Sequence, residues 1–126
     1  MRILVLGANG QLGRCLADEL HETNHQVLLA SRAEIDLSNF HITQTEISRF
    51  GPDVVINASA YTAVDKAESD EETAYLINHL AVANIAKACR DIDCVLIHVS
   101  TDYVFDGLSI LPYQEDAATN PMSVYG

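Results

Sequence analysis

Two stretches of the chain hold residues whose types and spacing could do chemistry. The turn Gly7-Ala8-Asn9-Gly10-Gln11-Leu12-Gly13 carries three glycines at intervals of three, directly after the apolar run Arg2–Leu6. The stretch Ser100-Thr101-Asp102-Tyr103 places three hydroxyls and a carboxylate directly after the apolar run Cys94–Val99. Continuous apolar runs are typical of strands that are covered on both faces of a parallel sheet. Both stretches are therefore expected at the carboxyl edge of such a sheet, where ligands bind in open α/β folds.

The glycine turn has the pattern of a dinucleotide-binding turn. Gly7 permits the tight turn, Gly10 lets backbone approach a pyrophosphate, and Gly13 lets the following helix lie close to its strand. The helix N-terminus adds free N–H donors and a partial positive charge. Glycine triplets also occur in loops without a ligand, but the strand before this one and the helix after it favour phosphate binding.

Arg32 bears on the choice of cofactor. The strand expected over His25–Ala30 ends at Ser31-Arg32, about where an NAD-selective fold places an acidic residue for the ribose 2′-hydroxyl. An arginine there can pair with a 2′-phosphate instead. The sequence therefore admits NADPH or NADH as the cofactor, and a solvated surface arginine remains the alternative interpretation of Arg32.

Apolar spacing and capping residues outline the elements that must position these groups. We expect helices over Gln11–Glu22, from Ser38 or Asn39 to about Phe50, and over Glu71–Arg90, and the start of another helix at Asn120-Pro121. Further strands are expected over His25–Ala30 and Asp53–Asn57, with a short edge strand over Glu34–Leu37. Val64–Asp70 is expected to form a loop or short turn. The alternation of strand and helix predicts an α/β fold with a doubly wound parallel sheet, Rossmann-like and with right-handed crossovers.

Composition limits the class of protein. The 126 residues leave room for one domain. With 18 acidic and 7 basic residues the formal net charge is −11, which disfavours nucleic acid as a partner. No apolar run approaches the roughly 18 residues of a membrane span, and no signal-peptide pattern precedes the first strand. Cys15, Cys89 and Cys94 lack metal-ligand spacing, so we expect reduced core thiols in a cytoplasmic protein without a metal.

Four segments occur in the order seen in one enzyme family. They are the glycine turn, Asn57-Ala58-Ser59-Ala60-Tyr61-Thr62-Ala63-Val64-Asp65-Lys66-Ala67-Glu68, Ser100-Thr101-Asp102-Tyr103-Val104-Phe105-Asp106-Gly107 and Pro121-Met122-Ser123-Val124-Tyr125-Gly126. On these residues the whole chain resembles the N-terminal part of the dTDP-4-dehydrorhamnose reductases, which are extended short-chain dehydrogenases/reductases. The third segment is the most specific, because related sugar-nucleotide epimerases and dehydratases more often carry a Ser-Ser pair followed by Val-Tyr-Gly.

The resemblance implies an oxidoreductase of dTDP-rhamnose biosynthesis, which serves cell-surface polysaccharides. Hydride would pass from NAD(P)H to the C4 ketone of the nucleotide sugar dTDP-4-dehydro-L-rhamnose, giving dTDP-L-rhamnose. Thr101 and Tyr125 match the family's catalytic residues, Thr101 orienting the carbonyl oxygen and Tyr125 protonating it, and Thr101, Asp102 and Tyr125 would contact the substrate. The implied cofactor contacts are Gly7, Gly10, Gln11, Leu12, Gly13, Arg32, Asp36, Leu37, Ala60, Tyr61, Thr62 and Val99, with Asp36 and Leu37 near the adenine.

The same resemblance implies that some of the machinery lies outside these residues. The lysine of the family's Tyr-x-x-x-Lys motif would fall four residues after Tyr125, at position 129. We therefore expect residues 1–126 to form an NAD(P)-binding domain without the substrate domain, inactive alone, and a homodimer stays open. Two alternatives also stay open: a non-catalytic NADP-binding subunit such as the regulatory subunit of methionine adenosyltransferase, and another sugar-nucleotide epimerase or dehydratase.

Overall fold

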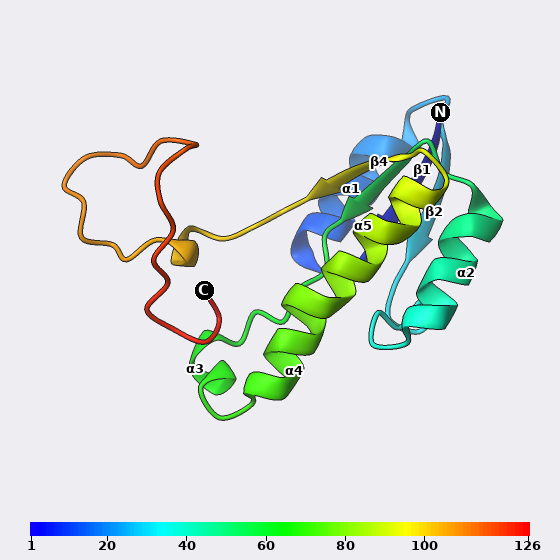
Figure 1. Cartoon of the computed structure of the whole chain (residues 1–126). Coiled ribbons are helices and arrows are strands. Elements are labelled where there is room, and N and C mark those ends of the chain that lie inside the picture. Colours follow the sequence, from blue (N-terminus) through cyan, green and yellow to red (C-terminus); the bar gives the residue numbers. More distant parts are fainter.

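The computed structural model describes residues 1–126 and contains one four-stranded parallel sheet (Figure 1). Its strands are β1 (Arg2–Leu6), β2 (Gln26–Ala30), β3 (Val54–Asn57) and β4 (Val95–His98), in the spatial order β2-β1-β3-β4. The register pairs Leu6 with both Ala30 and Asn57, and Asn57 with His98. The carboxyl ends of all four strands therefore meet at one edge, and the strand order reverses between β1 and β3, which is where open α/β sheets bind ligands.

Helices cover both faces of the sheet, which confirms the doubly wound expectation. Helix α1 (Gln11–His21) lies on one face, and α2 (Phe40–Phe50) and α5 (Ala81–Asp91) pack against each other on the opposite face (Figure 1). The largest buried apolar cluster lies between the sheet and the α2/α5 pair, and comprises Leu4, Leu6, Ala30, Ile35, Leu37, Ile47, Val55, Ala81, Ile85, Ala88 and Cys89. None of the helices combines the length and the apolar character that a membrane span requires.

Local chemistry fixes the ends of α2 as expected. The Asn39 side chain accepts a hydrogen bond from the Ile42 N–H at 3.1 Å and caps the start of the helix. Gly51 ends it with φ of 58°, the left-handed conformation that glycine adopts without strain.

The long helix predicted over Glu71–Arg90 is continuous but changes its winding. It consists of α4 (Glu71–Tyr75), the π-helical segment η1 (Leu76–Leu80) and α5. A π-helical turn places an extra residue in the helix and is found mainly at functional sites. In this chain the turn contains Asn78, which reaches the site described below.

The edge strand expected over Glu34–Leu37 is absent. The Asp36 carboxylate accepts hydrogen bonds from the N–H and the hydroxyl of Ser38, so the backbone turns here instead of extending along β2. These hydrogen bonds hold the pKa of the Asp36 carboxyl below its usual range. Leu37 is buried in the core, because the turn directs its side chain inward.

Two further expectations need correction. The segment expected as a loop or short turn over Val64–Asp70 contains a short helix, α3 (Val64–Ala67). No helix begins at Asn120-Pro121 within residues 1–126, and the Asn120 side chain caps no turn but donates to the Asp106 carboxylate at 3.2 Å. A first helical turn fixes several residues before it gains one hydrogen bond, so an uncapped start is unfavourable.

The cysteines differ from one another in their surroundings. Cys89 is buried between α5 and the sheet, and burial together with the neighbouring Cys94 raises the pKa of its thiol to about 12. Cys94 is half-buried. Cys15 is exposed on α1, so the expectation that all three are core thiols is wrong for this residue.

Candidate functional site

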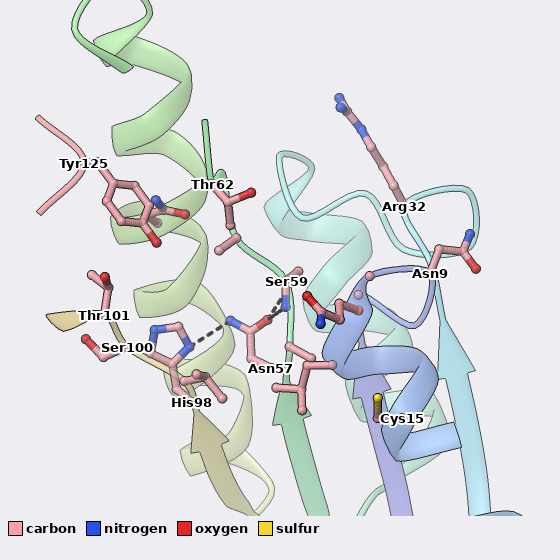
Figure 2. A pocket seen from close by; sticks show the side chains of 18 of the residues that line it. Asn9, Cys15, Arg32, Asn57, Ser59, Thr62, His98, Ser100, Thr101 and Tyr125 are labelled. Carbon is pink, nitrogen blue, oxygen red and sulfur yellow. Dashed lines mark hydrogen bonds between the residues drawn. The ribbon is translucent and has the colours of Figure 1, made fainter. Parts of the chain in front are cut away.

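A cleft of about 1020 Å³ lies at the carboxyl edge of the sheet. Its walls come from the glycine turn after β1, the ends of β2, β3 and β4, the π-helical turn and the last two residues of the chain (Figure 2). Ten residues predicted for the site line it: Gly7, Gly10, Gln11, Leu12, Arg32, Ala60, Thr62, Val99, Thr101 and Tyr125. The topology thus brings together segments that are far apart in the sequence.

The glycine turn approaches neighbouring backbone too closely for side chains at two positions. Gly7 has φ of 82°, and a Cβ there would lie 2.8 Å from Ser59. A Cβ on Gly13 would lie 2.2 Å from the Gly7 carbonyl oxygen, so Gly13 packs behind the turn and does not line the cleft. Gly10 has ordinary extended backbone, and its absent side chain leaves the mouth of the turn open.

The first turn of α1 offers unpaired donors to the cleft. Gly10 is the N-cap residue and has no side chain that could accept a hydrogen bond. The N–H groups of Gln11, Leu12 and Gly13 have no acceptor among the turn and side-chain hydrogen bonds of the protein. Free N–H groups at a helix N-terminus, next to a turn without side chains, form a site for an anion such as phosphate.

The charge of the cleft is opposite to that of the whole chain. The chain has 18 acidic residues, yet none of them lines the cleft, and Arg32 is the only charged side chain that does. The Arg32 side chain is 83% exposed, forms a 3.5 Å ion pair with Asp36, and extends outward at the β2 end of the cleft (Figure 2). A negatively charged ligand is therefore not repelled by the walls of the cleft, despite the net charge of −11.

Asn78 fixes the loop that follows β3. Its side-chain oxygen accepts from the Tyr61 N–H at 2.8 Å, and its amide group donates to the Tyr61 carbonyl at 2.9 Å. The Tyr61 side chain points away from the cleft and its hydroxyl donates to Asp70 at 3.1 Å. Desolvation and the Asp70 carboxylate raise the pKa of Tyr61 above its usual value. This double hydrogen bond holds Ala60 and Thr62 as a wall of the cleft.

Thr101 and Tyr125 lie on the same side of the cleft (Figure 2). The Thr101 hydroxyl accepts a hydrogen bond from the Tyr103 N–H at 3.2 Å and thereby caps the 3₁₀ turn η2 (Asp102–Val104). The same hydroxyl donates to the Asp102 carboxylate at 3.3 Å. The Tyr125 ring packs edge-to-face on Tyr103 with 5.5 Å between ring centroids. Two hydroxyls that are 24 residues apart in the sequence thus lie at one end of the cleft.

The segment that carries Tyr125 is fastened to the rest of the fold. The Glu68 carboxylate accepts from the Val124 N–H at 2.9 Å, although the two residues are 56 positions apart. The Ser123 hydroxyl accepts from the Gly126 N–H at 3.2 Å. These contacts and the Tyr103 ring hold Tyr125 against the cleft without a helix around it.

Several residues predicted for the site lie outside the lining. They are Gly13, Asp36, Leu37, Tyr61 and Asp102. Gly13 packs against the Gly7 carbonyl behind the turn, and the Tyr61 backbone is hydrogen-bonded to the Asn78 side chain. Leu37 belongs to the core.

The cleft also contains polar residues that sequence reasoning missed, chiefly Asn57, Ser59, Asn78 and His98. Asn57 and His98 were included in the predicted strands, and only their position as the last residue of each strand signals that they face the cleft. Asn78 was visible as a polar residue in an apolar helix, but its partner could not be predicted because the π-helical turn sets its direction. No three His, Cys, Asp or Glu side chains gather as metal ligands.

Comparison with known proteins gives consistent matches over the whole chain. The family model described as RmlD substrate binding domain matches residues 1–126. A dTDP-4-dehydrorhamnose reductase of Burkholderia thailandensis is 46% identical over 126 residues, covering 100% of this chain and 42% of that protein. The crystal structure of a dTDP-4-dehydrorhamnose reductase from Clostridium acetobutylicum superposes with a TM-score of 0.97 at 40% identity, covering 100% of this chain and 45% of the other.

A second solved structure is reported with a ligand. The dTDP-4-dehydrorhamnose reductase of Bacillus anthracis, in complex with NADP, matches with a TM-score of 0.95 at 34% identity and covers 98% of this chain and 44% of that one. The chain thus spans less than half the length of these relatives. Since the family model matches every residue from 1 to 126, the chain belongs to the family described by the RmlD substrate binding domain.

Proposed function

We propose that residues 1–126 form the cofactor-binding part of an NAD(P)H-dependent dTDP-4-dehydrorhamnose reductase. The observation that carries the proposal is the cleft itself. A phosphate-binding glycine turn stands at one end, and the hydroxyls of Thr101 and Tyr125 stand at the other. A dinucleotide whose pyrophosphate lies on the N-terminus of α1 can extend across β1 and β3 to these hydroxyls.

The residues present fit an NAD(P) cofactor. Gly10, Gln11 and Leu12 would hold the pyrophosphate with backbone N–H groups, because a side chain at Gly10 would project into the mouth of the turn. Ala60 and Thr62 would lie along the cofactor on the β3 side. The exposed Arg32 would meet a 2′-phosphate at the adenine end, which favours NADPH over NADH.

Two side chains would act on the reacting carbonyl. Bound NADPH would supply a hydride to the C4 carbon of the sugar. The Thr101 hydroxyl now donates to Asp102 over 3.3 Å, a long hydrogen bond that a closer carbonyl oxygen can replace. The Tyr125 hydroxyl would then deliver a proton to that oxygen as a general acid. Thr101 and Tyr125 would contact the substrate directly, and Asp102, outside the lining, would adjoin it.

The remaining features of the proposal follow from the family. The substrate would be a nucleotide sugar, and the resemblance implies that the segments forming most of its pocket lie beyond residues 1–126. The reaction would take place in the cytoplasm.

A chimera tests the function of these residues. Residues 1–126 would replace the matching stretch of the Burkholderia thailandensis reductase, and NADPH oxidation would be followed with dTDP-4-dehydro-L-rhamnose. We expect the chimera to form dTDP-L-rhamnose, and Thr101→Val or Tyr125→Phe to lower kcat by roughly 10²- to 10⁴-fold. A chimera that folds and binds NADPH but yields no dTDP-L-rhamnose would contradict the assignment.

A further inference from the structure

Asn57 and His98 form a hydrogen-bonded pair on the floor of the cleft. They are register partners at the ends of β3 and β4, and the Asn57 amide nitrogen lies 3.1 Å from Nδ1 of His98 (Figure 2). Asn57 is 1% exposed, so its amide has no solvent alternative and its orientation is set by the protein.

The neighbouring hydrogen-bond donors determine the orientation of the Asn57 amide and the tautomer of the His98 imidazole. The Ser59 N–H lies 3.2 Å from Oδ1 of Asn57, and a backbone N–H can only donate. The Ser59 hydroxyl donates to the same oxygen. Asn57 therefore turns its NH₂ group toward His98, and Nδ1 of His98 must accept. The proton of the neutral ring is then on Nε2.

The second ring nitrogen is directed into the cleft. Figure 2 shows it on the side of the ring away from Asn57, where Ser100 and Thr101 lie. A charged imidazolium would place an N–H of Nδ1 against the NH₂ of Asn57, so the geometry selects the neutral ring. Desolvation by burial acts in the same direction and lowers the pKa of His98.

We propose that His98 is a cofactor-binding residue whose Nε2–H donates to an oxygen of the nicotinamide half of the dinucleotide. The inference rests on the proposed function, because it requires the pyrophosphate to lie at the glycine turn. With the phosphates there, the adenine half extends toward Arg32 and the nicotinamide half toward β4, where His98 stands. Asn57 is a positioning residue, since it fixes the tautomer and does not supply the donor itself.

Two substitutions of His98 separate ligand binding from structural support. His98→Asn keeps an oxygen near the position of Nδ1, so it can still accept from Asn57, but it has no donor near Nε2. His98→Gln places its NH₂ group near the position of Nε2 and loses the acceptor for Asn57. The affinity of NADPH and of adenosine 2′,5′-bisphosphate, which lacks the nicotinamide half, would be measured by calorimetry for each protein.

We expect His98→Asn to weaken NADPH binding by about 3- to 10-fold, as for one lost hydrogen bond. His98→Gln should stay within about 2-fold of the unsubstituted protein, and the affinity for the bisphosphate should be unchanged by either. Long-range proton–nitrogen NMR spectra of the ligand-free chain should show the Nε2–H tautomer. An Nδ1–H tautomer, unchanged NADPH affinity in His98→Asn, or equal losses in both variants would overturn the inference alone. An unsubstituted chain that does not bind NADPH would overturn the proposed function and this inference with it.

Discussion

At the scale of single residues, Gly7 and Gly10 of the first turn are needed for different reasons, the fold and the ligand. Gly7 is required by the fold, because its φ of 82° and the 2.8 Å distance to Ser59 exclude a side chain. Gly10 has ordinary backbone, and a Cβ there would lie 3.3 Å from the Gly7 carbonyl oxygen, a contact that a small shift relieves. The absence of a side chain at Gly10 is therefore explained by a ligand more than by the fold.

Substitution of Gly10 should mainly weaken NADPH binding, and substitution of Gly7 should mainly lower the free energy of unfolding. Gly10→Val should weaken NADPH binding by more than about 10-fold, because hydrogen bonds to charged phosphate oxygens are worth roughly 1.5–3 kcal/mol each. Its free energy of unfolding should fall little. Gly7→Val should instead lower the free energy of unfolding by at least about 2 kcal/mol. Calorimetric titration and urea unfolding of both variants check this, and unchanged NADPH affinity in Gly10→Val would refute the pyrophosphate assignment.

His98 gives the stability of the chain a pH dependence of known sign. Burial holds its folded-state pKa below the ordinary value of about 6.5, so the unfolded chain takes up the proton first as pH falls. The contribution of neutral His98 to the free energy of unfolding is fully present above the ordinary pKa of about 6.5, and it is lost as the pH falls from there toward the lower folded-state pKa. Urea unfolding between about pH 7.5 and 5 should therefore show a steeper loss of stability in the unsubstituted chain than in His98→Gln. Parallel curves would show that His98 titrates normally.

At the scale of elements, the strands and helices that could be predicted from the sequence are those marked by continuous apolar runs or by local capping and stop residues. The strands β1, β3 and β4 are short apolar runs, and the Asn39 cap and Gly51 stop of α2 are local signals. Glu34–Leu37 was predicted wrongly because its alternating apolar residues serve a turn fixed by Asp36 and Ser38. The pairing of Asn57 with His98 depends on the register of two strands 41 residues apart, which no local pattern encodes.

The π-helical turn should be essential for the wall of the cleft. Asn78→Ala removes two hydrogen bonds to the Tyr61 backbone and should lower the free energy of unfolding by about 1–3 kcal/mol. Asn78→Asp keeps the acceptor for the Tyr61 N–H but places a carboxylate oxygen against the Tyr61 carbonyl oxygen, so its loss should be at least as large as that of Asn78→Ala. Chemical denaturation of both variants measures the difference. If Asn78→Ala were as stable as the unsubstituted chain, the loop after β3 would be held by other contacts.

At the scale of the whole molecule, an acidic chain contains a cleft free of acidic side chains. The net charge of the chain is −11, yet the cleft offers backbone N–H groups and Arg32. The distribution of charge, rather than its total, is therefore what decides whether a phosphate can bind. The 126 residues match less than half the length of the reductases compared.

We predict that the 126-residue chain by itself does not reduce dTDP-4-dehydro-L-rhamnose. The lysine that would stabilise the Tyr125 phenolate, as the family resemblance implies, is expected at position 129, which residues 1–126 do not include. General acid catalysis and correct orientation are each worth orders of magnitude in rate. The check is NADPH oxidation by the chain beside the Burkholderia thailandensis reductase, and comparable rates would show that the missing groups are dispensable.

The location of the cofactor can be measured directly by titrating the isotope-labelled chain with NADPH and following the backbone amide resonances. The account predicts the largest shifts at Gly10 to Gly13, at Ala60 to Thr62, and at Val99 to Thr101, with α2 unaffected. Shifts confined to the outer face of α2, or none at millimolar NADPH in a chain that is folded, would contradict it.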